Sequence, residues 1–275
     1  MNKALKSMKN FPFEAVSHPQ LRLEAFRFTT LSSALWNGLC LTGHFWRFYW
    51  NSAPGAGLSV GGENLELLPD RFYVIPPECG LRTWCRAEVH PRQFYVHFEI
   101  SRLTGAASFS CRGLEPLPGD MKLLGKILTM LENDPASPLL YLLISALVSG
   151  TAARLDPEDF DLLPSDSLID GICARLRESP GADWSVEQLA REAALSVNGF
   201  LEKFHAATGF SPYRYILNLR YSLAARLLTE TEETIDAISA HVGFRDRFHF
   251  SREFKKLYGL PPAAYRRAYS HPEAE

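Results

Sequence analysis

Near the C-terminus, large apolar residues recur at helical spacing in two stretches that match each other. Five residues repeat at a constant offset of about fifty positions, and two of them are phenylalanines four positions apart, which share one face of a helix. Each unit is too small for a solenoid repeat, so the pattern predicts a duplicated helical motif. The matching residues are Phe200, Phe204, Gly209, Pro212 and Tyr215 in the first copy, and Phe250, Phe254, Gly259, Pro262 and Tyr265 in the second.

Polar residues predict where the helices of the first copy begin and end. Ser185 is followed three residues later by Gln188, a capping-box pattern that begins a short helix. Ala194 falls in the turn, Ser196 caps the helix that carries the phenylalanines, and Gly209 ends it. The first unit is therefore predicted to be a helix, a short turn and a second helix.

The second copy follows the same plan. A polar residue caps each helix, glycine falls in the turn, and a further glycine closes the unit. The residues are Thr234, the inward-facing Ile235, Ile238 and Val242, the turn residues Gly243 and Phe244, the cap Asp246, the buried Phe250, Phe254 and Leu257, and the final Gly259.

A longer helix is predicted between the copies. Ser211 and Pro212 open it, and apolar residues from Ile216 to Leu228 keep helical spacing. Such a rod suits two small modules. A helix-turn-helix places its second helix in the DNA major groove, so two units on one rod would read successive grooves, roughly 34 Å apart.

Candidate DNA contacts lie on the second helix of each unit. The second copy presents a cluster of basic residues, whereas the first looks neutral and would rely on hydrogen bonding. For any single residue, the alternative to a DNA contact is a charge that is simply hydrated at the helix surface. The candidates are Asn198, Glu202, Lys203 and His205 in the first copy, and Arg245, Arg247, His249, Arg252, Lys255 and Lys256 in the second.

Net charge gives no support for DNA binding. Residues 165–275 contain fourteen Lys and Arg but fifteen Asp and Glu. The expectation rests on local clustering and duplication, because sequence-independent affinity comes from phosphates neutralised at the contact face.

Residues 168–268 resemble the AraC/XylS family of bacterial transcription regulators. The resemblance implies a DNA-binding domain with two helix-turn-helix motifs. Two positions depart from the family pattern: Glu202 stands where the family usually has arginine, and Ser239 where it usually has alanine. The matching residues are Thr208, Gly209, Ser211, Pro212, Tyr215, Arg220, Ala224 and Leu228 in the linking helix, then 235–242 followed by Gly243, Phe244, Asp246, Phe250, Arg252, Phe254, Lys255, Gly259, Pro262 and Tyr265.

The first hundred residues have a different pattern, of short β-rich runs broken by glycine and proline. Runs such as 45–50, 71–75 and 94–100 predict closely spaced strands in a small β-barrel or double sheet. From Asp120 the spacing becomes helical, and Ser137 with Pro138 opens a second apolar helix through Arg154. These two helices are predicted to be either core or a dimer interface.

This half resembles the cupin-type sensor domain joined to many AraC-type regulators, especially those that control sugar use. The resemblance rests on Gly43, His44, residues 46–50, 68–70, 75–77 and 95–98. It implies a ligand pocket with aromatic faces and a few hydrogen-bonding groups. The chain lacks the His-x-His pair of metal-binding cupins, which disfavours metal catalysis. The ligand candidates are His44, Arg47, Tyr49, Trp84, Tyr95, His97 and Glu99.

Alternation along residues 46–50 leaves one question open. Trp46, Phe48 and Trp50 alternate with Arg47 and Tyr49, so one set belongs to a core and the other faces the pocket or solvent. The pattern does not say which.

Length and composition favour two globular domains. The 275 residues, 46% of them hydrophobic, allow two cores. Leu139 to Val148 is apolar but short for a membrane span, so a buried helix is expected. No signal-peptide pattern is seen at the N-terminus, and the five cysteines form no CxxC pair, which fits a reducing cytoplasm.

The sequence therefore predicts an α+β protein in three segments. Residues 1–154 form a cupin-like β-barrel with two helices, 155–165 an interdomain linker, and 166–275 an all-α domain with two helix-turn-helix motifs. The expected function is that of a cytoplasmic, ligand-responsive activator of sugar or related catabolic genes, with no catalytic residues, metal site or cofactor. The expected partners are a double-stranded DNA operator, a small-molecule effector such as a sugar, a second copy of the chain and RNA polymerase, with no membrane.

The sequence leaves two alternative functions open. In the first, the barrel only dimerises the protein and binds no ligand. In the second, which the absent His-x-His pair disfavours, a cupin enzyme is tethered to DNA.

Overall fold

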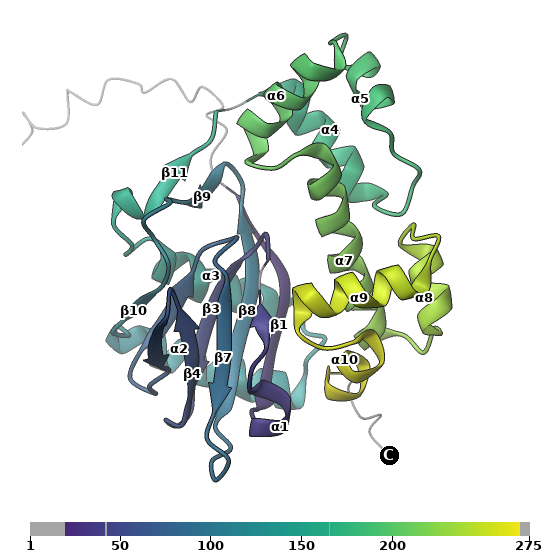
Figure 1. The fold of residues 1–275 in the computed structure, drawn as a ribbon. Helices are drawn as coiled ribbons and strands as arrows, with labels where there is room; N and C mark the ends of the chain where they lie inside the picture. The colour runs from purple at the N-terminus through teal and green to yellow at the C-terminus, as the bar shows by residue number, and fades with distance from the viewer. Residues whose placement is uncertain (1–19, 42, 165, 270–275) are drawn as a thin grey trace, which may run out of the picture.

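The computed structural model describes residues 20–41, 43–164 and 166–269. A strand-rich N-terminal part is followed by two helices, and an all-helical part completes the chain (Figure 1). This order confirms the α+β architecture that the sequence predicts.

A five-stranded antiparallel sheet forms the middle layer of the N-terminal part. All six residues of its strand β3 (Trp46–Asn51) are buried, because helices cover one face of the sheet and a second sheet covers the other. The strand order is β1-β8-β3-β6-β10, with β1 at Leu21–Thr30, β8 at Arg92–Ile100, β6 at Phe72–Ile75 and β10 at Arg112–Leu114.

The second sheet has four antiparallel strands. Its core with the first sheet includes Leu58, Leu81 and Tyr49, together with Trp36 from the short helix α1 (Ser33–Trp36). The strand order is β2-β7-β4-β5, with β2 at Cys40–Leu41, β7 at Leu81–Cys85, β4 at Ala56–Val60 and β5 at Glu63–Glu66.

The two faces of the main sheet show which set of alternating β3 residues lies in which core. Trp46, Phe48 and Trp50 belong to the core beneath helices α2 (Pro118–Asn133) and α3 (Pro138–Ala152). Arg47 and Tyr49 face the second sheet, because successive strand residues point to opposite faces. The polar set of β3 therefore lies between the two sheets.

Helix α3 buries only one face, whereas its apolar sequence predicts a buried helix. Leu140, Ile144, Leu147 and Val148 pack in the core with β3. Among the described residues, no helix is long and apolar enough to cross a membrane.

The segment predicted to be a linker contains regular structure. Residues 157–159 form a short 3₁₀ turn, and β11 (Phe160–Leu162) pairs antiparallel with β9 (Leu103–Gly105). Half of this segment is therefore attached to the N-terminal part. The domain boundaries themselves stay a prediction.

Seven helices form the described C-terminal part. The longest, α7 (Pro212–Glu230), contributes to two cores: Ile216 and Leu219 pack in the first, and Tyr221 and Leu228 pack in the second. One continuous helix thus joins two small modules. The others are α4 (Ser167–Glu178), α5 (Val186–Glu192), α6 (Val197–Thr208), α8 (Ile235–His241), α9 (Arg247–Tyr258) and α10 (Pro262–Tyr269).

The second helical module packs against the N-terminal part. In Figure 1, α9 and α10 lie beside the edge of the main sheet that carries β1. The rings of Phe45 and Tyr258 have centroids 6.3 Å apart, and Arg214 of α7 forms an ion pair with Glu78. The helical and strand-rich parts therefore share an interface.

Candidate nucleic-acid interface and ligand pocket

The first helix-turn-helix is built as its sequence predicts. The Ser185 side chain accepts a hydrogen bond from the Gln188 backbone N–H at 3.1 Å, and Ser196 accepts one from Gly199 at 3.2 Å. Ala194 in the turn has φ of 54°, and α6 ends at Gly209 with φ of 76°. Helices α5 and α6 form the motif.

The second motif, α8 and α9, repeats this construction. Thr234 accepts from the Ala237 backbone N–H at 3.1 Å, and Asp246 accepts from Phe248 at 2.8 Å. Gly259 ends α9 with φ of 78°, as Gly209 ends α6. Its turn, residues 242–246, is longer than the 193–196 turn of the first motif.

Arg220 of α7 connects the two motifs. Its guanidinium donates hydrogen bonds to the carbonyl oxygens of Pro180 at 3.0 Å and Ala182 at 2.9 Å, both just before α5. It also donates to the carbonyl of Gly243, in the turn of the second motif, at 2.9 Å. A side chain at Gly243 would come within 2.8 Å of the Gly181 carbonyl, so the motifs meet at a close backbone contact.

The basic residues predicted on the second motif lie largely at its surface. Arg245, Arg247, Arg252, Lys255 and Lys256 are exposed. The remaining candidate, His249, is half-buried, and its ring centroid lies 6.1 Å from that of Phe244.

Several of these charges already have acidic neighbours. Arg247 pairs with Asp236 of α8 at 2.6 Å, while Lys256 and Arg252 share Glu253 at 2.7 and 3.3 Å. Lys256 and Arg252 hold the pKa of the Glu253 carboxyl below its usual value, mainly through the hydrogen bond from Lys256. Local carboxylates therefore offset part of the basic face.

The candidate DNA contacts on the first motif differ in their surroundings. Asn198, Glu202 and His205 are exposed on α6. Lys203 is held by an ion pair of 2.7 Å with Asp166, whose side chain also caps α4. Its ammonium group is thus drawn toward α4.

Phe248 is a residue that sequence reasoning missed. Its side chain is 73% exposed at the beginning of α9, and Arg247 lies 5.0 Å from its ring centroid. Its position could have indicated this exposure, because a residue two before Phe250 does not share the helix face on which Phe250 and Phe254 are buried. An exposed aromatic ring can make the apolar contact that distinguishes a thymine methyl group.

Four of the predicted ligand residues meet between the two sheets. In the register of β3 and β8, Arg47 lies opposite His97, and Tyr49 lies opposite Tyr95. These four residues line a small cavity of about 40 Å³ together with Gln93 and Phe45. Leu257 and Tyr258 of α9 and Tyr265 of α10 complete its wall.

Trp84 is placed differently. It lies on β7 opposite Gly57 of β4, and its indole fills the space that a side chain at position 57 would occupy. Gly57 therefore lies inside a strand, with no room for a side chain. Trp84 is not among the residues that line the cavity.

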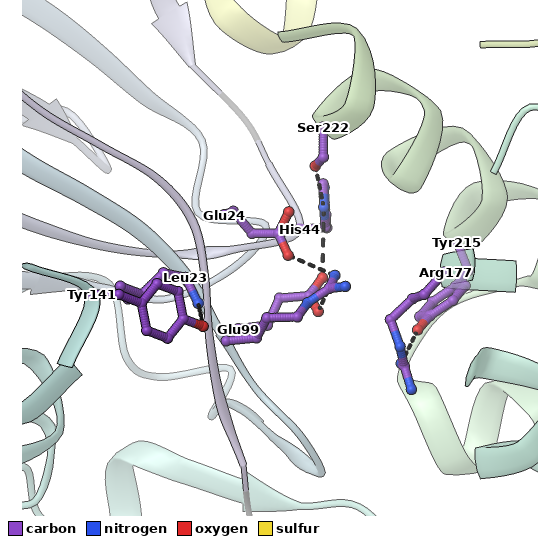
Figure 2. Close-up of polar contacts among 9 residues, drawn as sticks. Leu23, Glu24, His44, Glu99, Tyr141, Arg177, Tyr215 and Ser222 are labelled. Carbon is purple, nitrogen blue, oxygen red and sulfur yellow. Dashed lines mark hydrogen bonds and ion pairs between the residues drawn. The ribbon is translucent and has the colours of Figure 1, made fainter. Parts of the chain in front are cut away.

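His44 and Glu99 belong to a polar cluster that faces α7. Arg22 bridges Glu99 at 3.1 Å and Glu24 at 2.6 Å, while His44 Nε2 lies 3.5 Å from Ser222 Oγ (Figure 2). The pKa of His44 is lowered to about 3, mainly by burial and also by the positive charge of nearby Arg47. His44 is then neutral at pH 7, so its 3.7 Å contact with Glu99 is not an ion pair.

Glu24 of β1, which the sequence did not single out, is the titrating group of this cluster. Burial and the neighbouring Glu99 raise the pKa of its carboxyl to about 7, against the lowering effects of Arg22 and a hydrogen bond with Ser222. The sequence offers no signal for this residue, because Glu99 comes close to it through the pairing of β1 with β8 and Ser222 through the packing of α7.

A second hollow lies along this interface. A cleft of about 450 Å³ runs between β1 and helices α7, α9 and α10. It shares Phe45, His97, Tyr258 and Tyr265 with the smaller cavity. Among the described residues, no group of three or more His, Cys, Asp or Glu is arranged to hold a metal ion.

The comparisons with known proteins concentrate on the helical part. Residues 189–268 match a family described as a helix-turn-helix domain. An uncharacterized HTH-type transcriptional regulator of Haemophilus influenzae is 37% identical over 93 residues, which is 34% of this chain and 31% of that protein. A Streptomyces lividans protein described as an AraC-like transcription regulator is 36% identical over 92 residues, 34% of this chain and 30% of that protein.

The chain thus spans about a third of the length of these relatives. The whole fold is similar to that of ToxT from Vibrio cholerae, with a TM-score of 0.64 and 12% identity over 90% of this chain and 98% of ToxT. ToxT has also been solved with an unsaturated fatty acid bound. At this level of identity the likeness concerns the fold alone.

Proposed function

We propose that this chain, which carries a helix-turn-helix domain of the AraC type, is a sequence-specific DNA-binding transcription regulator. The observation that carries the proposal is the pair of similarly capped motifs held at a fixed spacing by α7 and Arg220. Two recognition helices on one rod suit two successive major grooves. The relatives are named as regulators, which favours regulation over catalysis.

The proposed DNA contacts are polar and basic residues of α6 and α9, together with Arg245 in the turn before α9. On α9, arginines would read guanine edges and lysines would neutralise phosphates. Phe248 joins the set through its exposed ring. The predicted residues are Asn198, Glu202, Lys203, His205, Arg245, Arg247, His249, Arg252, Lys255 and Lys256.

The N-terminal part is proposed to bind a small-molecule effector. Arg47, Tyr49, Tyr95 and His97 line the cavity between the sheets, and residues of α9 and α10 close it. An occupant would therefore touch both the strand-rich part and the second DNA-binding motif. A sugar, which the family resemblance implies, would use the aromatic faces and Gln93.

A second copy of the chain is the proposed partner at α3. Leu139, Tyr141 and Leu142 of this helix are exposed, and its fifteen residues include no charged side chain. Exposed apolar residues of this kind favour a protein interface. The wider proposal is a cytoplasmic activator that contacts RNA polymerase and needs no cofactor.

A regulator that binds DNA without an effector is the second candidate. Contacts between Phe45 and Tyr258 and between Glu78 and Arg214 would hold its two parts together in one fixed arrangement. In that case the strand-rich part would only dimerise the protein.

The experiment that tests the DNA-binding proposal is selection of bound duplexes from a random pool by the full chain. A selected sequence with two half-sites about one helical turn apart is expected. Gel shifts at fixed salt should show weaker binding when either half-site is scrambled. Equal binding to selected and scrambled DNA would overturn the proposal.

A further inference from the structure

Arg47 is a buried cation in the middle of the N-terminal part. Its side chain is 1% exposed, although arginine is among the residues that seldom leave the protein surface. It lies on β3 opposite His97, on the face that looks toward the second sheet. The guanidinium therefore points into the region between the sheets, where it lines the 40 Å³ cavity.

Among the described residues, no carboxylate forms an ion pair with Arg47. Glu78 pairs with Arg214, and Glu99 pairs with Arg22. Nη1 of Arg47 is fully buried without a hydrogen-bond partner. The guanidinium lies over the face of the Phe45 ring, whose centroid is 4.7 Å from Cζ.

The two histidines nearby do not balance this charge. Burial is the main cause that lowers the pKa of both His44 and His97, and the positive charge of Arg47 is the second. Both imidazoles are then neutral, and the Nδ1 atom of each is buried without a hydrogen-bond partner. The region thus contains a permanent positive charge and unsatisfied polar atoms of neutral rings.

A buried guanidinium requires an anion more than most groups do. Arginine keeps its proton at any pH that the protein meets, so it cannot become neutral when it is buried. Leaving an ion unpaired away from water is costly, and a cation–π contact offsets only part of that cost. A planar carboxylate matches the guanidinium through two parallel hydrogen bonds.

We propose that Arg47 binds the carboxylate of a small monocarboxylate effector between the two sheets. The inference rests on the proposed ligand-responsive function and specifies its ligand class. One cation calls for one negative charge, which disfavours a phosphate dianion. A neutral sugar would leave Arg47 without an ion-pair partner among the described residues.

The walls of the cavity indicate the remainder of this ligand. Apart from Arg47, they are mainly aromatic and aliphatic, with Gln93 as a neutral hydrogen-bonding group. A volume of about 40 Å³ corresponds to only a few water molecules, which is enough for a carboxylate head. The body of the ligand would extend past Phe45 and Tyr258 toward the larger interdomain cleft.

This location would couple the ligand to the second DNA-binding motif. Leu257 and Tyr258 are the last residues of the recognition helix α9, and they form part of the cavity wall. A ligand that displaces Tyr258 would change the contact between α9 and the strand-rich part. The carboxylate site and operator affinity are therefore expected to be linked.

Matched ligand pairs test the charge requirement on the full chain. Calorimetric titrations with benzoate and benzamide compare a carboxylate with a neutral group of similar shape. Octanoate and gluconate compare an apolar body with a hydroxylated one, and glucose and inorganic phosphate are the alternative classes. At least one carboxylate should bind ten-fold or more tightly than benzamide, glucose and phosphate.

Variants locate the site. Arg47→Met should weaken carboxylate binding at least ten-fold while raising the unliganded melting temperature, because it removes an unpaired buried charge. Arg47→Lys should retain part of the binding. Arg82→Met changes an exposed arginine on β7 and should leave carboxylate affinity unchanged. Unchanged carboxylate affinity in Arg47→Met would overturn the assignment, as would a lower melting temperature of that variant without ligand.

The outcomes separate this inference from the proposed function. If glucose binds and shifts operator affinity while no carboxylate does, ligand response stands and the carboxylate assignment is wrong. If no compound binds or changes operator affinity, both ligand response and the carboxylate assignment fail. DNA selection tests the regulator proposal independently of either result.

Discussion

The guanidinium of Arg220 donates a hydrogen bond of 2.9 Å to the carbonyl oxygen of Gly243, which joins the linking helix to the turn of the second motif. The same side chain donates to Pro180 and Ala182, at the entrance to the first motif. One residue therefore constrains both motifs relative to α7. Since two recognition helices must reach two grooves together, this constraint bears directly on affinity for a two-site operator.

We predict that Arg220→Ala lowers operator affinity at least ten-fold and destabilises the chain by about 2–4 kcal/mol. Three carbonyls lose a charged donor: those of Pro180 and Gly243 are half-buried and that of Ala182 is exposed. Each such bond contributes about 1.5–3 kcal/mol, and water recovers part of this. Gel shifts and urea unfolding measure the two effects.

Arg226→Ala is the control, since Arg226 is an exposed residue of the same helix with a 3.9 Å ion pair to Glu230. It should leave operator affinity and stability within about 0.5 kcal/mol of wild type. Equal behaviour of the two variants would show that Arg220 does not set the spacing of the motifs.

The helix-turn-helix part could be predicted in detail because its signals are local. Ser185, Ser196, Thr234 and Asp246 cap their helices through the backbone N–H groups two or three residues ahead. Caps and apolar spacing need no knowledge of distant residues. Asp166 caps helix α4 in the same way, which is a local signal of the same kind.

The pocket could be predicted only in part, because it depends on pairing between distant strands. Arg47 and His97 are fifty residues apart and meet through the register of β3 and β8. Both faces of β3 are buried, so alternation alone does not distinguish the helix-covered face from the cavity face. Tyr258 reaches the cavity through interdomain packing, which has no local sequence signal.

We predict that Arg247→Ala and Arg252→Ala each weaken specific DNA binding by about 1–3 kcal/mol, because arginine reads guanine with two hydrogen bonds. Both side chains are exposed on α9; of their carboxylate partners, Asp236 is exposed and Glu253 is half-buried. Gel shifts at fixed salt measure the effect. Arg267→Ala, an exposed change on α10, is the control. Wild-type affinity in both α9 variants would refute the assignment.

Lys255 is predicted to contact phosphate rather than bases. Lys255→Ala should weaken binding to all sequences alike and make the slope of log affinity against log salt shallower by about 0.9. Lys256→Ala should have the smaller effect, because Lys256 already pairs with Glu253 at 2.7 Å. Lys122→Ala on α2 is the control. An unchanged slope for Lys255→Ala would place this lysine away from the DNA.

Glu24 is predicted to make the interdomain contact sensitive to pH. Its pKa is about 7 in the folded chain and 4.5 as a free side chain, so the folded state holds the proton more tightly. The carboxyl therefore costs stability as pH rises from about 4.5 through 7, by up to about 3 kcal/mol. His44, with a folded pKa of about 3, acts in the opposite direction and costs stability as pH falls below 6.5.

The difference between wild type and Glu24→Gln isolates the Glu24 contribution from that of His44. Urea unfolding at intervals from pH 5 to 8 should show Glu24→Gln gaining stability relative to wild type as pH rises. Glu63→Gln, an exposed change on β5, should run parallel to wild type. A constant difference between Glu24→Gln and wild type across this range would contradict the prediction.

The last prediction concerns Glu202, which occupies in α6 the position that Arg252 occupies in α9. A carboxylate at the DNA face repels phosphate, but it can also accept a hydrogen bond from a cytosine amino group. A third role, pairing with Lys203 to hold the helix, is disfavoured because Lys203 pairs with Asp166 at 2.7 Å. We favour repulsion, because few other groups on α6 can reach bases.

On that basis, Glu202→Arg should raise affinity for operator and scrambled DNA alike and should steepen the salt dependence by about 0.9. Glu187→Arg on α5 makes the same change in net charge away from the recognition helix, and it should have a smaller effect on both. If Glu202 reads cytosine, its replacement removes a base contact while adding a phosphate contact. Operator affinity would then fall while affinity for scrambled DNA rises, and that divergence would show that repulsion is the wrong interpretation.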